Sequence, residues 1–355
     1  MNAKKKDYLI IGGGIAGLMI AHQLRKAGKD FLLVDRQEKN TSSKIAAGMF
    51  NPISGKRMSV NWKANELLNS LHSNFTEFET LLEAKYLIQA NIHQAFGNIK
   101  ESNDFASRLD VEQFKQFVNP EPKVESALID DFGTFEVIGS GWVKTSDWMS
   151  DFQNYLEHDQ AFFKAEFEWT DLLYSNNEWH WQEQFFSNII SCEGYQNNSN
   201  PYFNWLPFKL CKGQVLLIKC PGLNPKYILK RGVYLVHQYE DVYKVGASYE
   251  WDFEDARVTT EGKENLIEKV KHVINLPFEV IDQIAGIRPT TRDRAAILGA
   301  HPIQKNLFIF NGLGTKGMLQ APFLSEHMAS HLLHQTPLFK EVDIDRFKSF
   351  YPNGQ

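Results

Sequence analysis

Short apolar runs followed by helix-like patterns occur at both ends of the chain. Residues 8–11 and 31–34 are uninterrupted apolar runs typical of buried parallel strands, and residues 15–28 between them carry apolar positions at helical spacing. Residues 307–310 form a similar run, and a helix is predicted from about 318 to 333. Strand, helix and strand in this order predict a βαβ unit with parallel strands, which places the chain in the α/β class.

The middle of the chain predicts further strands and helices. One segment has apolar residues at i, i+4, i+8, i+11 and i+15 and predicts an amphipathic helix: Leu67, Leu71, Phe75, Phe78 and Leu82. Strands are expected at four apolar runs, the last two forming a hairpin: residues 187–194, 213–218, 233–236 and 242–245. Helices are expected near 146–156, directly after a glycine-rich boundary at 139–141, and near 266–274. Residues 196–201 are expected to form a polar loop.

The length of the chain, 355 residues, exceeds that of a typical single hydrophobic core, so two domains are expected. Strands that resemble those of nucleotide-binding sheets occur at the start, middle and end of the chain, which favours a discontinuous nucleotide-binding domain. We expect that domain to contain residues 1–62, 141–206 and 284–355. A β-rich α+β domain is expected to contain residues 63–140 and 207–283.

Composition and charge argue against several classes of protein. The formal net charge of −5 disfavours a mainly electrostatic interaction with nucleic acid. The three cysteines include no Cys-x-x-Cys pair, which argues against a disulfide framework or a cysteine zinc site and favours a cytoplasmic protein. No apolar run approaches the length of a membrane span. His327, His331 and His334 have helical spacing but no His-Glu-x-x-His pattern, so a solvated helix face is expected there rather than a metal site.

A Gly-x-Gly-x-x-Gly motif follows the first predicted strand. Gly12 permits the tight turn, Gly14 the close approach of a pyrophosphate, and Gly17 close packing of the helix on the sheet. Asp35 ends the next predicted strand and can accept a hydrogen bond from a ribose hydroxyl. The motif therefore predicts a dinucleotide site for FAD or NAD, and the acidic residue disfavours NADP.

A second motif with the same spacing, Gly312, Gly314 and Gly317, follows the last predicted strand. It has no acidic residue at the matching offset, where Gln335 stands, so it is a poor dinucleotide site by itself. Its glycines either only allow a tight strand-to-helix turn, or let the helix that begins near Met318 direct the positive end of its dipole at a flavin. In the second case, the two chain ends fold around one cofactor.

Two polar side chains are candidates for substrate binding. Arg288 can bind a carboxylate through two parallel hydrogen bonds. Taken alone, this segment is better explained by a structural ion pair, such as Arg292 with Asp293, than by a ligand site. Tyr234 lies on a predicted strand, where core packing is the simpler interpretation.

Together, these segments resemble the D-amino acid oxidase, glycine oxidase and sarcosine oxidase superfamily of FAD-dependent oxidoreductases. The resemblance covers nearly the whole chain and is strongest at residues 8–58 and 285–330. It implies a Rossmann-like FAD-binding domain of the glutathione-reductase type with an inserted β-rich substrate domain. It also implies non-covalent FAD, because Gly286 stands where sarcosine oxidases attach the flavin through a cysteine. The residues that the resemblance assigns to FAD are Gly12, Gly14, Ile15, Ala16, Gly17, Asp35, Arg36, Ser43, Ala46, Ala47, Gly48, Gly194, Gly314, Thr315, Lys316, Gly317 and Met318.

The resemblance further implies a reaction. Arg288 matches the arginine of the family's Gly-x-Arg-Pro motif, which binds the substrate carboxylate, and Tyr234 matches a tyrosine that faces the substrate. Met49 lies in the matching small-residue loop beside the flavin and is a third substrate-binding candidate. A small amino acid or N-substituted amine would lose a hydride to the flavin and leave an imine that hydrolyses, so no catalytic residue beyond the flavin is expected. Oxygen, a quinone or a partner protein would then accept the electrons.

Two alternative functions remain open. The flavin domain of a bacterial enzyme that removes a carboxymethyl group from the wobble uridine of tRNA shares the fold that the resemblance implies. We expect no fused methyltransferase domain here, and the acidic net charge disfavours a tRNA substrate. The other alternative is a flavoprotein subunit of a dehydrogenase complex.

Overall fold

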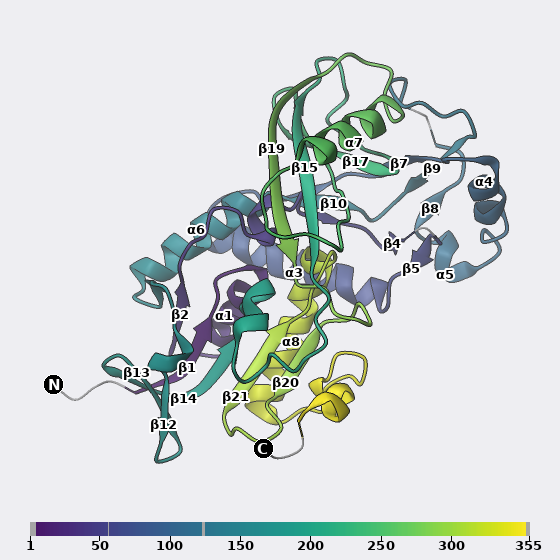
Figure 1. Ribbon diagram of the computed structural model, residues 1–355. Coiled ribbons are helices and arrows are strands. Elements are labelled where there is room, and N and C mark those ends of the chain that lie inside the picture. The colour runs from purple at the N-terminus through teal and green to yellow at the C-terminus, as the bar shows by residue number, and fades with distance from the viewer. Residues whose placement is uncertain (1–4, 56, 123–124, 353–355) are drawn as a thin grey trace.

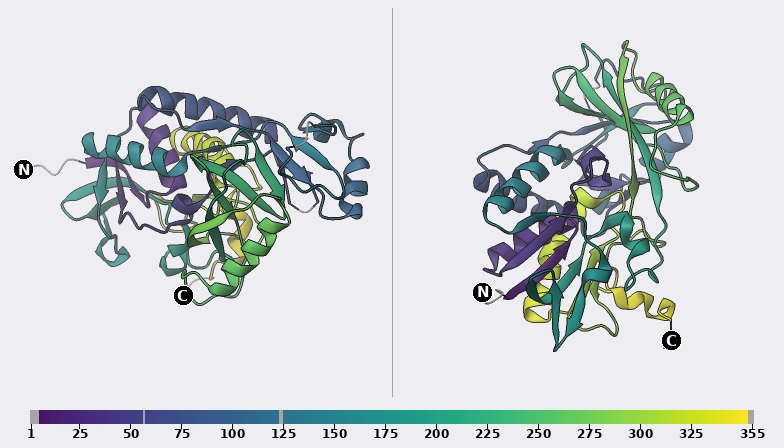
Figure 2. Two further views of the ribbon diagram at one scale, coloured as in Figure 1. Left: turned by 90° about the horizontal axis from the view of Figure 1, so that it is seen from above. Right: turned by 60° about the vertical axis from the view of Figure 1, so that its left-hand side comes forward.

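The computed structural model describes residues 5–55, 57–122 and 125–352. Its elements form two lobes, each built around a large β-sheet (Figure 1). Helices α1 (Ile15–Lys26), α6 (Thr145–His158) and α8 (Gly317–His334) lie with the first sheet, and α7 (Thr260–Lys271) lies with the second. Figure 2 shows the same two lobes from two further directions.

The first sheet has eight strands and joins the two ends of the chain. Its main order is β11-β2-β1-β14-β13-β12, while β21 also pairs with β14 and β20 pairs with β21. The pairs of β1 with β2 and β14, of β2 with β11, and of β14 with β21 are parallel. The strands are β1 (Lys5–Ile11), β2 (Phe31–Asp35), β11 (Phe162–Lys164), β12 (Leu173–Ser175), β13 (Glu178–Trp181), β14 (Gln184–Ser191), β20 (Ile297–Ala300) and β21 (Leu307–Asn311).

The first βαβ unit has the predicted elements. Helix α1 connects β1 to β2, and every residue from Ile15 to Leu24 is buried. A helix that is buried all round needs neighbours on several sides, and α6 and α8 both pack against α1. The helix ends at Lys26, and Gly28 follows with a φ of 65°, a conformation that favours glycine after a helix.

A polar network fixes α8 against α1 and α3 (Ala64–Leu81). The Glu326 carboxylate accepts hydrogen bonds from Ser70 Oγ at 2.9 Å and Asn74 Nδ2 at 2.6 Å. Asn74 Oδ1 in turn accepts one from Gln23 Nε2 at 2.7 Å. Because these groups are satisfied only in one arrangement, the network sets the register of the three helices.

The second sheet also has eight strands, in the order β19-β15-β18-β17-β16-β7-β9-β8. Neighbouring strands are antiparallel except β16 and β7, which are parallel. Helix α7 packs against β15, β17 and β18 and contributes to their core. The strands are β7 (Ile92–Ala95), β8 (Val118–Asn119), β9 (Thr134–Val137), β15 (Cys211–Lys219), β16 (Ile228–Arg231), β17 (Val233–Tyr239), β18 (Val242–Gly246) and β19 (Glu279–Arg288).

Smaller elements complete the described chain. The short strands are β3 (Met49–Phe50), β4 (Ile53–Ser54), β5 (Ser59–Val60), β6 (Leu87–Gln89) and β10 (Gly141–Val143). The short helices are α2 (Ser42–Ile45), α4 (Ile99–Ala106), α5 (Glu112–Lys115), η1 (Trp169–Asp171), η2 (Gly194–Ser199) and η3 (Ile344–Phe350). Within the described residues, no helix combines the length and the apolar character that crossing a membrane requires.

The predicted elements are present, with a few local differences. The predicted boundary at 139–141 leads first into β10, which pairs with β3 and β6, and only then into α6. The predicted polar loop at 196–201 contains most of the short helix η2. The helix expected at 266–274 begins earlier, at Thr260, because the Thr259 side chain caps it by accepting from Gly262 N. The domain boundaries stay a prediction, and residues 1–4, 56, 123–124 and 353–355 of the expected ranges lie outside the described residues.

Candidate cofactor and substrate site

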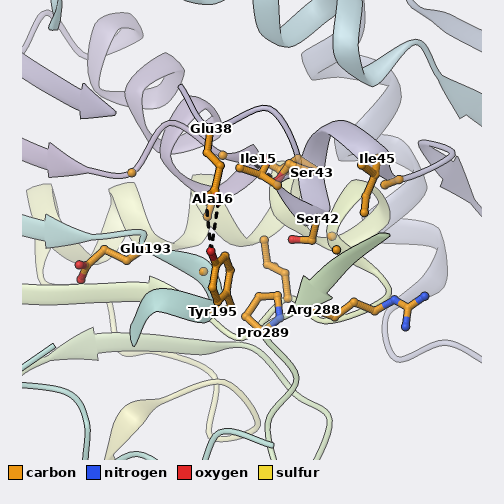
Figure 3. A pocket seen from close by; sticks show the side chains of 18 of the residues that line it. Ile15, Ala16, Glu38, Ser42, Ser43, Ile45, Glu193, Tyr195, Arg288 and Pro289 are labelled. Atoms are coloured by element: carbon orange, nitrogen blue, oxygen red, sulfur yellow. Dashed lines mark hydrogen bonds between the residues drawn. The ribbon is translucent and has the colours of Figure 1, made fainter. Parts of the chain in front are cut away.

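One cavity of about 540 Å³ lies between the two lobes (Figure 3). Its walls come from both glycine-rich loops, from α2, from the residues after β2 and β14, and from β15, β17, β18 and β19. Both ends of the chain therefore contribute to a single cavity. All the predicted site residues line it except Gly17 and Lys316.

The first glycine-rich loop brings the N-terminus of α1 to the cavity without a capping side chain. Gly14 is the N-cap and makes no side-chain hydrogen bond, and Ser43 Oγ accepts from Ile15 N at 3.2 Å. A Cβ on Gly17 would lie 1.8 Å from the carbonyl oxygen of Gly12. Gly17 is therefore explained by packing within the loop, which is why it does not line the cavity. The remaining N–H groups of the first helical turn suit a phosphate.

Asp35 ends β2 beside this loop. Its Oδ2 accepts from Gly13 N at 2.7 Å and its Oδ1 from Gln37 N at 2.6 Å. These two donors hold the carboxylate in the cavity wall, and each oxygen keeps a further lone pair for a ligand hydroxyl. Arg36 lies next to it and pairs with Glu38 at 2.7 Å.

The small-residue loop after α2 packs closely on β10. Gly48 has a φ of 68°, and a Cβ there would lie 2.0 Å from the carbonyl oxygen of Val143. Its own carbonyl accepts from Val143 N at 3.0 Å. Because nothing larger than glycine fits, residues 46–49 run close to the sheet and form one wall of the cavity.

The second glycine-rich loop places the N-terminus of α8 at the same cavity. Gly317 and Met318 begin the helix and line the cavity, and no side chain caps this helix end either. Lys316 is the N-cap residue, and its side chain is half-buried outside the cavity wall. Burial and the nearby charge of Arg294 lower the pKa of its amine.

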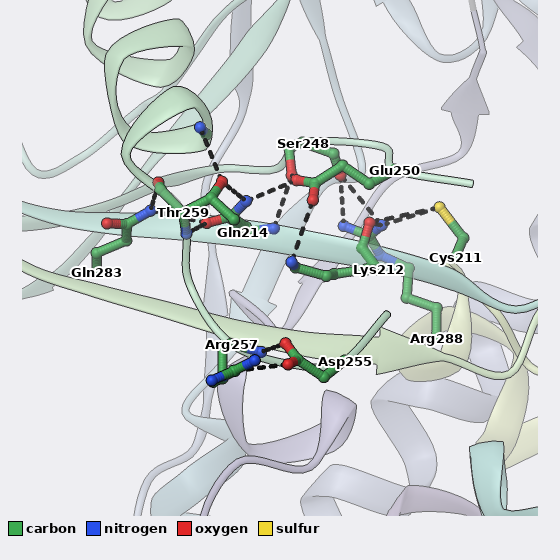
Figure 4. Close-up of polar contacts among 11 residues, drawn as sticks. Cys211, Lys212, Gln214, Ser248, Glu250, Asp255, Arg257, Thr259, Gln283 and Arg288 are labelled. Carbon is green, nitrogen blue, oxygen red and sulfur yellow. Dashed lines mark hydrogen bonds and ion pairs between the residues drawn. The ribbon is translucent and has the colours of Figure 1, made fainter. Parts of the chain in front are cut away.

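Tyr234 and Arg288 lie at the end of the cavity that the second sheet forms. Tyr234 Oη lies 3.5 Å from Asn51 Nδ2. Arg288 ends β19, and its Nη1 and Nη2 each donate to the carbonyl oxygen of Ser248 at 3.2 Å (Figure 4). Its guanidinium also lies over the Tyr249 ring, 4.8 Å from the centroid. The cavity thus carries a fixed cation and a phenol at one end.

Two expectations from the sequence differ from the structure: the ion pair within the segment at 292–293, and the solvated helix face of the three C-terminal histidines. Asp293 forms its ion pair with Arg346, at 2.8 Å, and not with its neighbour Arg292. Of the three C-terminal histidines, only His334 is exposed. His327 Nε2 accepts from Phe339 N at 3.0 Å, and His331 Nδ1 lies 2.9 Å from the carbonyl oxygen of Thr336. These side chains fix the segment after α8 because that segment folds back on the helix. Among the described residues, no cluster of ligands suits a metal ion.

Lys244 is a cavity residue that the sequence reasoning missed. It lies on β18, only 8% of the residue is exposed, and its Nζ donates to the carbonyl oxygen of Ala46 at 3.1 Å. Burial lowers the pKa of this amine to about 8. The signal in the sequence is a single lysine within the apolar run at 242–245. At neutral pH this amine exists in both protonation states, which suits proton transfer.

The opposite end of the cavity contains a second missed group. The Glu193 carboxylate accepts from Ser191 Oγ at 2.7 Å, Trp169 Nε1 at 3.0 Å and Asn200 Nδ2 at 2.6 Å. Burial nevertheless raises its pKa. These bonds anchor the turn that carries Gly194 into the cavity wall.

A contact also crosses the cavity at this end. The side chains of Glu38 and Tyr195 approach each other from opposite walls, and Tyr195 Oη donates to Glu38 Oε2 at 3.3 Å (Figure 3).

Residues 7–331 match the family described as FAD dependent oxidoreductase, DAO. The chain belongs to the DAO family. Its cofactor is therefore FAD, and it is an enzyme that catalyses oxidation and reduction.

Curated members related to this DAO-family chain have different functions in their names. A tRNA 5-methylaminomethyl-2-thiouridine biosynthesis bifunctional protein of Idiomarina loihiensis is 30% identical over 156 residues, which are 41% of this chain and 25% of that protein. An uncharacterized oxidoreductase of Bacillus subtilis, YurR, is 22% identical over 92% of this chain and 95% of its own length. The matches to the bifunctional tRNA proteins span between 25% and 58% of their length.

Solved structures of the same architecture cover nearly the whole chain. Glycine oxidase from Geobacillus kaustophilus has a TM-score of 0.79 and 20% identity over 94% of this chain and 96% of its own. Iminodiacetate oxidase from Chelativorans sp. BNC1 also has a TM-score of 0.79, with 18% identity over 94% of this chain and 98% of its own. These likenesses show the DAO-type fold.

The residues in the cavity fit FAD. Two helix N-termini without side-chain caps, α1 and α8, reach the cavity, and their N–H groups suit electron-rich groups of a ligand. A Cβ on Gly12 would clash with the carbonyl oxygen of Cys192, and one on Gly48 with that of Val143, so only glycine lets these two loops form the cavity wall in this way. Asp35 keeps a free lone pair on each carboxylate oxygen beside the first loop. The cavity thus offers hydrogen-bond donors and an acceptor of the kinds that FAD requires.

Proposed function

We propose that this protein oxidises the C–N bond of a small amine or amino acid that carries a carboxylate. The observation that supports the proposal is that Arg288, Tyr234, Met49 and Lys244 line the cavity to which both helix N-termini point. Bound FAD supplies the hydride acceptor, and the resulting imine is hydrolysed by water. The FAD is held without a covalent bond, by the residues that the sequence assigns to it.

In this proposal, Arg288 and Tyr234 orient the substrate. A guanidinium has five N–H donors, and the bonds to Ser248 occupy only part of them. Its remaining edge can bind a carboxylate through two parallel bonds, while the Tyr234 hydroxyl donates a third. Fixing the carboxylate fixes the α-carbon relative to the cavity walls, and such positioning is itself a large contribution to rate.

In this proposal, Lys244 accepts the proton that the substrate amine must lose. An amine loses a hydride from its α-carbon only when its nitrogen is neutral, so the ammonium form of the substrate must first give up a proton. The neutral form of Lys244 Nζ, with a pKa of about 8, can accept that proton within the cavity.

The test is anaerobic reduction of the purified yellow protein by a panel of amino acids and N-substituted amines. Carboxylate-bearing amines should bleach the flavin, while the matching amines without a carboxylate should not. Acid precipitation should release the FAD into the supernatant. Colour in the pellet would contradict non-covalent binding, and bleaching without regard to the carboxylate would contradict the proposed substrate class.

A second candidate is removal of a carboxymethyl group from a modified tRNA base. The similarity to the bifunctional tRNA proteins favours it, and a carboxymethylamine has the same carboxylate and amine as the proposed substrates. Reduction of the flavin by tRNA carrying such a base, but not by free amino acids, would support this candidate. Retention on tRNA that falls steeply with added salt would support it further.

A further inference from the structure

Arg288 crosses a neighbouring strand to reach its hydrogen-bond acceptor. It ends β19, which pairs with β15, and Gly213 of β15 lies opposite Gly286 of β19. Ser248 lies on the other side of β15, where its N–H donates to the carbonyl oxygen of Gln214 at 3.0 Å. The Arg288 guanidinium donates to the carbonyl oxygen of that same Ser248 (Figure 4). The side chain therefore lies across β15.

Gly213 is the residue over which the guanidinium passes. A Cβ built on Gly213 would lie 2.0 Å from Arg288 Nη2, 2.4 Å from Cζ and 2.5 Å from Nη1. Such distances are far below van der Waals contact, so a side chain at this position and the observed guanidinium exclude each other. The φ of Gly213 is not among the positive values in this chain, so the backbone alone does not require glycine there.

Because the Arg288 side chain lies across β15, only one edge of its guanidinium is left to bind a ligand. Nη1 and Nη2 bond to Ser248, and Nη1 also lies 3.5 Å from the carbonyl oxygen of Lys212. Within the described residues, no hydrogen bond from Arg288 Nε is found, so the edge formed by Nε and the second Nη2 hydrogen can take a carboxylate.

We propose that Gly213 is a positioning residue for the carboxylate clamp. It acts through Arg288, because its missing side chain leaves the space in which the guanidinium bonds to Ser248 and presents its Nε–Nη2 edge. This inference rests on the proposed function, in which Arg288 binds the substrate carboxylate. It explains why the Arg288 guanidinium is held in one orientation.

The variant Gly213→Ala should fold and bind FAD. The atoms that a Cβ would meet are the far end of a flexible side chain, which can move, and the φ at this position suits alanine. The expected damage is local, since the guanidinium leaves Ser248 and its position is no longer defined. The variant keeps the positive charge of Arg288 and the bound FAD, so we expect the change to appear only in the affinity for a carboxylate.

The experiment is a double-mutant cycle with acetate as the probe, on the FAD-loaded protein. Acetate affinity is measured by calorimetry and by perturbation of the flavin absorbance, for wild type, Gly213→Ala, Arg288→Ala and the double variant. We expect Arg288→Ala and Gly213→Ala each to weaken acetate binding by about tenfold or more, as for loss of charge-assisted hydrogen bonds. In the Arg288→Ala background, Gly213→Ala should change it by less than about twofold, because no guanidinium is left to displace.

The outcomes separate the two proposals. If Arg288→Ala leaves acetate affinity unchanged, the carboxylate clamp is wrong and the role of Gly213 is wrong with it. If Arg288→Ala weakens binding but Gly213→Ala does not, the clamp stands and only the role of Gly213 is refuted. A Gly213→Ala effect of equal size in both backgrounds would show general damage to the site and would also refute it. FAD content and unfolding midpoint are recorded for every variant.

Discussion

At the residue scale, Lys244 is a cavity side chain whose chemistry depends on burial. Its pKa of about 8 predicts that the rate of flavin reduction rises with pH as the amine loses its proton. Lys244→Met should remove that limb of the pH profile and lower the rate near pH 7 by roughly 100-fold, the usual size of general-base effects. Anaerobic stopped-flow measurement of flavin reduction between pH 6 and 10 checks this.

Lys212→Met provides the matched control for Lys244. Lys212 is also a buried lysine of the second sheet, but it pairs with Glu250 at 3.4 Å and does not line the cavity. Its replacement should leave the pH limb in place. A profile that is the same for wild type and Lys244→Met would show that Nζ takes no part in the proton transfer.

Some of these residues could be predicted from local sequence and others could not. Gly12, Asp35 and Gly48 lie in short segments whose spacing is set by the turn or strand that contains them. Lys244 and Gly213 depend on neighbours that are distant in sequence: one is beside the loop at residue 46, the other beneath a side chain from position 288. Their roles follow from strand pairing, which the sequence does not display.

At the element scale, the two glycine-rich loops share a spacing but differ in packing. A Cβ on Gly17 would meet the backbone of Gly12 at 1.8 Å, whereas a Cβ on Gly317 would have its nearest contact at 3.7 Å, with Ile15. Gly17→Ala should therefore lower the free energy of unfolding by on the order of 3 kcal/mol, because backbone must move. Urea unfolding of the two alanine variants beside wild type measures the difference.

Gly317→Ala is the control for that measurement. Gly317 is the first residue of α8, has ordinary space around it and has no positive φ. Alanine there should leave stability unchanged or raise it by up to about 1 kcal/mol, since alanine favours the helix. Equal losses for both variants would mean that the third glycine serves the same purpose in both loops.

The long elements followed from periodicity, and the short ones did not. Apolar patterns predicted α1, α3, α8 and the strands of the first βαβ unit, since each is long enough or apolar enough to show its burial in the sequence. Strands such as β10 and β6 have three residues each, too few to show a period, and they exist because they pair with each other. The capped start of α7 at Thr259 was also missed, although threonine is a favoured cap.

At the scale of the whole molecule, stability should depend on pH through His22. This side chain is fully buried, and its Nε2 lies 2.9 Å from Glu77 Oε2. Burial lowers its pKa from 6.5 to about 4, against the opposing effect of Glu77. Below pH 6.5, His22 binds a proton in the unfolded chain, whereas in the folded protein it binds one only as the pH approaches 4. The free energy of unfolding should therefore fall as pH decreases from 6.5 towards 4, by up to roughly 3 kcal/mol from this group.

Urea unfolding at a series of pH values tests this contribution. His22→Gln keeps a hydrogen-bonding side chain but cannot titrate, so its stability should depend less on pH between 6.5 and 4 than that of wild type. His158→Gln changes an exposed histidine and should keep the wild-type slope. Parallel curves for wild type and His22→Gln would show that the pKa of His22 is the same in the folded and unfolded states.

The overall arrangement could be predicted only in part. The start, middle and end of the chain were expected in one sheet, and β1, β14 and β21 do lie side by side. The order of the second sheet was not foreseen, because β7 joins it by pairing in parallel with β16, far along the chain. Such pairings depend on long-range packing, which leaves no local periodic signal.

Because both glycine-rich loops line one cavity, the order in which the chain is synthesised affects when FAD can bind. The wall that α8 provides begins at Gly317, so it is synthesised after every strand of the two large sheets. Until then, a nascent chain has the other walls of the cavity but lacks the N-terminus of α8. FAD should therefore stabilise a chain that contains α8 more strongly, by mass action, than one that lacks it. We therefore expect tight FAD loading to follow the synthesis of α8, and fragments that end before Gly317 to gain less of this protection.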